Sequence, residues 1–284
     1  MNQNSPIDRP SPNGALPVYW VGPRCLAGDD GRLYDTVADT LTGLGWTALT
    51  IVRGLHEDTE FDDVLEDRQV PVSYTHLDVY KRQLRSTVLH VSPDGLRWAQ
   101  WMLADEPFHL GGLPMAWQVC AREDRSDMTA RWSAYFTPGL PGEAVADFLL
   151  ALDARDRPAT SFGGPDRVLD AVTAKGWFRD IDQPAAGATD PTFTSHLAFG
   201  EVPPLIQDGD PSVLTVGPEE AGPMGWQAWS QPAPDAPYLW AASFSAGVPA
   251  DLVAAFAASL SSTAPVLRRV LPESTKDRLL RAPA

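Results

Sequence analysis

The chain has 284 residues, of which 44% are hydrophobic, so it is long enough to form two domains of ordinary size with real cores. Its net charge of −15 disfavours nucleic acid and anionic membrane surfaces as partners, because binding to either needs clustered Lys and Arg. The only 2 cysteines lie at no metal-ligand spacing, which excludes a disulfide scaffold and favours a cytoplasmic protein. We expect no signal peptide and no membrane span, since no apolar run is long enough.

Residues 1–15 are polar and rich in Pro and Asn, which is typical of disorder. The first of two folded units is predicted over 16–156, and its first helix covers 30–44. A glycine at position 45 is placed for the left-handed residue that ends a helix, and Trp46 can then fold back onto that helix. The sequence GLGWTA here superficially fits a dinucleotide fingerprint, but that fingerprint opens a helix, whereas this one closes a helix.

An acidic loop is predicted to follow, over 57–83. Its first part, 57–67, carries seven acidic side chains in eleven positions. An EF-hand calcium loop would need glycine at its sixth position and glutamate at its twelfth, and counting from Asp58 these places hold Asp63 and Gln69. We therefore predict a solvated acidic loop and no metal site.

The second part of that loop, VSYTHLDVYKRQ at 72–83, has no Ala, Gly or Pro, although the chain is rich in all three. It resembles a translated cloning or sequencing linker. In support, 40 residues separate Trp46 from Ser86, whereas 18 separate Trp177 from Ser195 at the matching place in the second unit. The alternative is a natural loop insertion. The first interpretation predicts that deletion of 72–83 leaves stability unchanged or improved.

An antiparallel sheet and a closing helix complete the first unit. The turn sequence SPDG at 92–95 joins two strands of this sheet. The predicted strands are 47–52, 86–91, 97–103, 117–122 and 132–136. A helix then opens at Pro141, at the first helical position, where the missing N–H costs nothing.

The chain repeats this arrangement. Trp132–Leu152 matches Trp240–Leu260 without a gap, with 9 of 21 positions identical. A linker at 157–164 therefore leads to a second unit over 165–262, which lacks a clear SPDG. Its predicted strands are 194–199, 212–216, 226–229 and 238–244. A C-terminal tail follows at 263–284, with a short basic helix predicted at 266–281.

The order of GW, SPDG, an isolated WQV strand and WxAxF-x4-P-x3-V-x2-F-x3-L resembles an actinobacterial family known as domain of unknown function number 317, in two tandem copies. The resemblance implies no activity, cofactor or catalytic residue. The predicted fold class is α+β: each unit has an antiparallel sheet of about four or five strands with helices packed on one face. We expect the two units to pack on each other.

The ten tryptophans are the unusual feature of the composition. Three pairs recur in register, namely Trp46/Trp177, Trp117/Trp226 and Trp132/Trp240, and are predicted to be core residues. Trp132→Ala and Trp240→Ala are each expected to destabilise their own unit and spare the other. Three more lack partners in register and are the candidates for an exposed aromatic binding surface: Trp98, Trp101 and Trp229.

No sequence pattern for catalysis, a metal or a cofactor is found. His90 lies four residues before Asp94, an arrangement that allows a base and its orienting acid, or simply a strand histidine beside a turn aspartate. The leading hypothesis is a non-catalytic cytoplasmic interaction module with an unknown protein partner. The alternative is a small-molecule enzyme with a site between the two units, where pockets often form.

Overall fold

The computed structural model describes residues 17–53, 85–102, 109–110, 112–161, 163–200 and 224–284. The predictions made for 1–15, for the acidic loop at 57–83 with its segment 72–83, and for a strand at 212–216 lie outside these residues.

The described residues form an α+β fold from two tandem copies of one unit, as predicted. The first copy comprises α1 (Leu33–Gly43), β2 (Thr47–Arg53), β3 (Arg85–Val91), β4 (Arg97–Trp101), β7 (Trp117–Ala121), β8 (Trp132–Phe136) and α2 (Gly142–Asp153). The second comprises α3 (Pro165–Thr173), β9 (Phe178–Arg179), β10 (Gly187–Thr189), β11 (Ser195–Phe199), β12 (Met224–Ser230), β13 (Trp240–Ser245) and α6 (Ala250–Leu260). Each copy therefore reads helix, five strands, helix.

The two copies share one antiparallel sheet of ten strands, in the order β2-β3-β4-β7-β8-β13-β12-β11-β10-β9. The copies meet where β8 pairs with β13, and there Tyr135 lies opposite Ser243. These two residues occupy the same place in the repeated sequence. A pseudo-two-fold axis therefore passes between them and relates one half of the sheet to the other.

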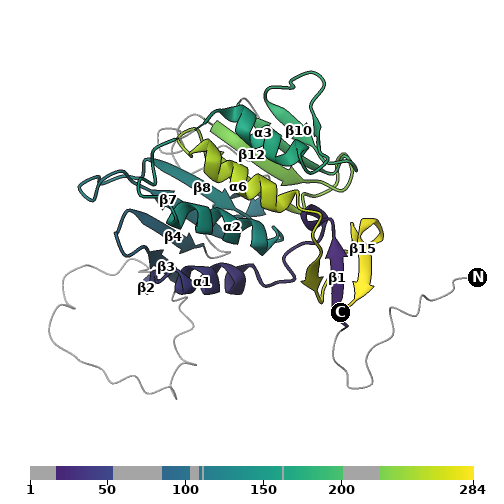
Figure 1. Cartoon of the computed structure of the whole chain (residues 1–284). Coiled ribbons are helices and arrows are strands. Elements are labelled where there is room, and N and C mark those ends of the chain that lie inside the picture. The colour runs from purple at the N-terminus through teal and green to yellow at the C-terminus, as the bar shows by residue number, and fades with distance from the viewer. Residues whose placement is uncertain (1–16, 54–84, 103–108, 111, 162, 201–223) are drawn as a thin grey trace, which may run out of the picture.

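All four described α-helices cover the same face of this sheet, as Figure 1 shows. Beneath them, at the pseudo-axis, lie four fully buried rings, with neighbouring centroids 5.1–5.8 Å apart: Phe136, Phe148, Phe244 and Phe256. Each copy contributes two of these rings, so the copies share one core. The continuous core argues against the expectation that a core substitution in one copy spares the other, and unfolding measurements can test it.

The repeated GW pair closes a helix in both copies, as predicted. Gly45 and Gly176 have positive φ values of 77° and 91°. The backbone N–H of Trp46 returns to the Leu41 carbonyl at 3.0 Å, and that of Trp177 returns to the Val172 carbonyl at 3.3 Å. This satisfies carbonyls that the end of a helix leaves without partners. In the second helix of each copy, α2 and α6, Pro141 and Pro249 lie at the N-cap, one residue earlier than the predicted first helical position.

The six tryptophans that recur in register are core residues, with at most 5% of each exposed. Three of them also donate their indole N–H. The acceptors are the carboxylate of Asp153 for Trp46 at 2.7 Å, the Pro158 carbonyl for Trp132 at 3.1 Å and the Cys25 carbonyl for Trp240 at 2.9 Å. These bonds attach neighbouring segments to the core.

The basic helix predicted at 266–281 is wrong. The tail instead forms β14 (Val266–Arg268), a single 3-10 turn and β15 (Leu280–Pro283), and β1 (Tyr19–Gly22) lies between these two strands. Pro272 interrupts the apolar pattern, and proline in a helix interior removes a hydrogen bond and clashes with the preceding turn. Arg268 points inward, with two hydrogen bonds of 2.7 Å to Glu143 at the start of α2.

The order of strands also corrects the alignment of the two copies. Counted from the pseudo-axis, β3 corresponds to β10, not to β11, so Ser86 and Ser195 are not equivalent. The counterpart of the SPDG turn is therefore the turn between β10 and β11, which has the sequence DPTF at 190–193.

Candidate functional site

The sheet face opposite the helices is the open face, which no described helix covers. Cross-strand partners share a face, so the pairing places a row of side chains across it. The row that crosses the pseudo-axis is polar: Gln100, Gln118, Tyr135, Ser243 and Gln227. Gln118 donates to the Tyr135 hydroxyl at 3.4 Å.

A small hairpin covers the centre of the open face. It consists of β5 (His109–Leu110) and β6 (Leu113–Pro114). Its apolar side chains form a second cluster with Met115, Ala241, Tyr135 and Trp229. The parts of the open face available to a partner are therefore its flanks.

The structure does not bring the three candidate tryptophans together. Trp98 and Trp229 lie half-buried on the open face, on β4 and β12. These strands are four intervals apart, so about 19 Å separates them at the usual strand spacing. Trp101 lies on the other face, packed under the helices with its ring centroid 5.3 Å from that of Trp117 and 5.1 Å from that of Tyr34.

Trp98 and Trp229 lack partners in register because the copies place their open-face tryptophan on different strands. In the first copy Trp98 lies opposite Cys120. The equivalent pair in the second copy is His196 opposite Trp229, so the tryptophan has moved to the neighbouring strand.

The second copy extends this pair into an exposed aromatic surface. The aromatic ledge consists of Phe178, Phe193, His196 and Trp229. His196 stacks on Trp229 with ring centroids 5.2 Å apart and an interplanar angle of 20°. Phe178 stacks on Phe193 at 6.5 Å and 21°. Thr189 pairs with both Phe178 and His196 across the strands, so it joins the two stacks in one row.

The outer stack is exposed to solvent, with Phe178 55% exposed and Phe193 71% exposed. Phe193 also has a φ of 56°, in the left-handed region that a bulky side chain rarely adopts. Strained backbone of this kind persists only where its surroundings enforce it, and it gathers at functional sites. An exposed, strained phenylalanine contributes little to the core, which favours a role in binding.

Asp190 enforces the conformation of this turn. Its buried carboxylate accepts the backbone N–H groups of Thr192 at 2.9 Å, Thr194 at 2.7 Å and Ser195 at 2.6 Å. These hydrogen bonds hold the turn that carries Phe193 in its conformation.

The sequence did not reveal Phe178 or Phe193, because they lie on separate segments whose pairing only the fold shows. The turn sequence Asp-Pro-Thr-Phe at 190–193 was the signal that could have indicated an exposed phenylalanine at position 193.

His196 is a neutral part of the ledge. Burial lowers its pKa below 6.5, although the carboxylates of Asp190 and Asp180 oppose this. Its Nδ1 lies 3.2 Å from the hydroxyl of Thr189. The ring therefore presents a flat, uncharged surface at neutral pH, suited to stacking.

His90 and Asp94 do not form a catalytic pair. Both ring nitrogens of His90 are buried, with no hydrogen-bond partner among the described residues. The carboxylate of Asp94 instead accepts the Ser92 hydroxyl at 2.6 Å and the Leu96 N–H at 2.9 Å, and it pairs with Arg97. Partial burial acts to raise the pKa of Asp94, but these bonds hold it below its usual value.

The SPDG turn is thereby explained as structural. Arg97, 5% exposed, extends from this turn to the end of α2, where its guanidinium donates to the carbonyls of Leu152 and Arg155. The turn thus attaches the sheet to the helical layer.

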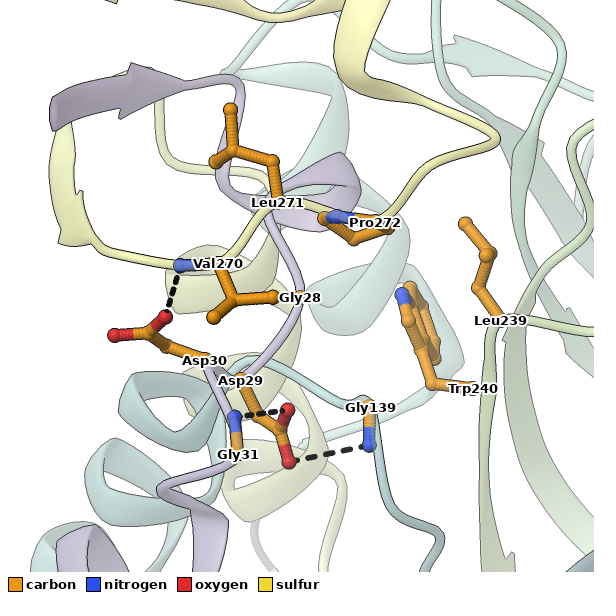
Figure 2. Close-up of a pocket in the computed structure, with 10 residues that line it drawn as sticks. All are labelled: Gly28, Asp29, Asp30, Gly31, Gly139, Leu239, Trp240, Val270, Leu271 and Pro272. Atoms are coloured by element: carbon orange, nitrogen blue, oxygen red, sulfur yellow. Dashed lines mark hydrogen bonds between the residues drawn. The ribbon is translucent and has the colours of Figure 1, made fainter. Parts of the chain in front are cut away.

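A small cavity of about 180 Å³ lies where both copies meet the chain's terminal segments (Figure 2). Its walls include Leu239, Trp240 and Pro272. Ligand pockets are usually about 300 Å³ or larger, so this one is small for a substrate.

The two acidic residues that line this cavity, Asp29 and Asp30, accept hydrogen bonds from backbone N–H groups. Asp29 accepts the N–H of Gly31 at 3.0 Å and that of Gly139 at 3.2 Å, while Asp30 accepts those of Arg269 and Val270 (Figure 2 draws three of these bonds). They join the N-terminal segment to the tail and to the loop before α2. The cavity is a structural junction.

Neither cysteine is an activated nucleophile. Burial, with a contribution from the charge of Asp190, raises the pKa of Cys25 to about 12, and burial raises that of Cys120 to about 11. Both are therefore thiols at neutral pH. In the part of the chain that the structure describes, no group of His, Cys, Asp and Glu side chains is arranged to hold a metal ion. No described helix is long and apolar enough to cross a membrane.

Comparison with known proteins finds a similarity in both copies of the repeated unit. The family described as SPDY, domain of unknown function (DUF317), matches residues 91–159 and 209–266. No curated protein and no solved structure matches the chain. Each matched segment contains the strand and helix of the repeated WxAxF motif, β8 with α2 and β13 with α6. The two matches are consistent with two copies of the DUF317 domain, and in the structure both repeated units contribute to one sheet.

Proposed function

We propose that this chain is a non-catalytic, cytoplasmic protein-binding module, and that the aromatic ledge is its contact surface. The observation that carries the proposal is Phe193, which is 71% exposed, is held at a φ of 56° and stacks on Phe178, itself 55% exposed. Exposed aromatic side chains on a fixed scaffold are typical of binding hot spots.

The chemistry of the ledge indicates an apolar or aromatic segment of a partner protein. Two stacked ring pairs offer flat surfaces and few hydrogen-bonding groups. The net charge of −15 on the whole chain favours a partner with basic flanks, through long-range attraction. The same charge disfavours nucleic acid, which also stacks on aromatic rings.

The test is affinity capture on the immobilised chain from an actinobacterial lysate, since the family that the sequence resembles is actinobacterial. The wild type is compared with the double variant Phe178→Ser/Phe193→Ser. The matched control is Met128→Ser/Leu150→Ser, which removes two other exposed apolar side chains, 97% and 47% exposed.

We expect a protein retained by the wild type and by the control, and lost from the ledge variant. Calorimetry with that purified protein should show a Kd at least about tenfold weaker for the ledge variant, as hot-spot truncation predicts. Equal retention by both variants would place the contact elsewhere on the molecule. A small molecule that co-purifies and is turned over would instead support the alternative of an enzyme.

A further inference from the structure

The two ends of the ten-stranded sheet differ although the sheet is pseudo-symmetric. The end in the second copy is β9, which has 2 residues and whose Arg179 binds Asp166 and Asp170. The equivalent strand in the first copy is β2, with 7 residues. Natural proteins shorten or charge their edge strands to prevent pairing with another chain, and of the two described edge strands of this sheet β9 is protected in this way.

The β2 strand is open for pairing. It pairs with β3 on one side, and within the described residues no strand pairs with its other side. Every residue from Thr47 to Ile51 is exposed, including Leu49 at 49% and Ile51 at 39%. The strand's sequence has no proline, lysine or acidic residue that would discourage addition of another strand.

We infer that β2 is the contact between two copies of this chain, which pair antiparallel about Thr50. In this register Leu49 of one copy lies opposite Ile51 of the other, on the same face. Such a contact is isologous, with the same surface used by both partners, and it closes after two chains. The chain already makes a contact of the same kind internally, where β8 and β13, which are equivalent strands of the two copies, pair about Tyr135 and Ser243.

A second copy fits this edge in charge as well as in shape. TALTIVR contains one basic residue, at its end, and in the antiparallel register that end meets the threonine end of the other copy. No like charges are therefore opposed within the strand pair. The net charge of −15 on each chain still repels the other at long range, so the dimer should tighten as salt is added.

Cross-linking tests the register. The chain's own cysteines, Cys25 and Cys120, are buried, so an added cysteine is the accessible thiol in the described part of the chain. Antiparallel partners have Cα atoms about 4.5–5.5 Å apart, within reach of a disulfide. Thr50→Cys should therefore cross-link rapidly under mild oxidation. Thr47→Cys is the control, since its two copies would be about 20 Å apart in this register.

Charge exchange tests the interface itself, by sedimentation velocity. Leu49→Lys/Ile51→Lys opposes like charges across the pair and should weaken dimerisation at least tenfold, as should Leu49→Glu/Ile51→Glu. An equimolar mixture of the two variants should restore a dimer. Circular dichroism confirms that each variant is folded, which the exposure of both positions leads us to expect.

The control for this experiment is Phe178→Lys/Phe193→Lys, which should leave the dimer intact and so separates this contact from the aromatic ledge. The inference is overturned by a monomeric wild type at 200 µM in high salt, by equal cross-linking at positions 47 and 50, or by a mixture of charge variants that stays monomeric. Loss of the dimer in the Phe178→Lys/Phe193→Lys variant would also overturn it.

Discussion

Truncation of Trp132 tests whether the two copies form one cooperative unit. The side chain is 2% exposed, its ring packs edge-on against Phe148 at 6.2 Å, and its N–H donates to the Pro158 carbonyl at 3.1 Å. Trp132→Ala removes all three contributions. The cavity and lost burial cost about 3–5 kcal/mol, and the orphaned carbonyl adds about 1 kcal/mol.

The measurement is urea unfolding, followed by tryptophan fluorescence and far-UV circular dichroism. With an m-value of about 3 kcal/mol/M, the midpoint should fall by about 1–2 M. Because Phe136 and Phe148 of the first copy pack against Phe244 of the second, we expect a single transition for both probes. Trp240→Ala should give a shift of similar size, again in one transition.

Two controls complete this experiment. Trp132→Phe keeps a ring but loses the N–H, so its midpoint should lie between those of the wild type and Trp132→Ala. Met128→Ala, at a side chain 97% exposed, should leave the midpoint unchanged. Two separate transitions, with only one of them shifted by Trp132→Ala, would refute the shared core and restore two independent units.

Three further predictions concern groups whose role the structure defines. Burial lowers the pKa of His90 below 6.5, so below that pH the unfolded chain binds more protons than the folded chain. The unfolding free energy should therefore be at its full value above about pH 7 and fall by up to about 1.4 kcal/mol per pH unit below 6.5. His90→Phe should reduce this slope when unfolding is measured from pH 7.5 to 5.5. Arg97→Met leaves two carbonyls at the end of α2 and one carboxylate without their donor, and should lower the unfolding free energy by about 2–3 kcal/mol in urea titrations. Gly139 has a φ of 83°, and a Cβ there would lie 2.4 Å from the carbonyl oxygen of Leu239, so Gly139→Ala should lower the thermal midpoint by several degrees. Gly31→Ala, at a φ of 68° with open space around it, should cost only about 1 kcal/mol, so an equal loss from both would contradict the role of the contact.

Local sequence patterns were sufficient to predict the main helices and strands of the repeated unit and their buried faces. The period-two aromatic pattern from Trp132 and the helical spacing from Val145 to Leu152 predicted which sides are buried. The glycine at 45 predicted the helix end, because few other residues take a left-handed conformation cheaply.

The sequence alone did not predict which strands pair when they lie far apart in the chain. The tail at 266–283 reads as basic and apolar, which fits a helix, yet β1 lies between its two strands. The aromatic ledge joins residues from one turn and three strands, and no periodicity connects Phe178 to Phe193. Trp101 was selected as unpaired in the repeat, but strand alternation places it under the helices.

The three-stranded sheet β14-β1-β15 has a consequence for synthesis in the cell. Tyr19 pairs with Arg268 and with Pro283, and Trp20 pairs with Leu267 and Ala282. At about 5–20 residues per second, the ribosome needs on the order of tens of seconds between making β1 and making its neighbours. Throughout that time the first strand must remain unpaired beside a growing chain, and it enters the sheet only after the second copy has left the exit tunnel. The three-stranded sheet is therefore completed last, by the residues at 266–283, and a ribosome that stalls before them leaves β1 without either of its partner strands.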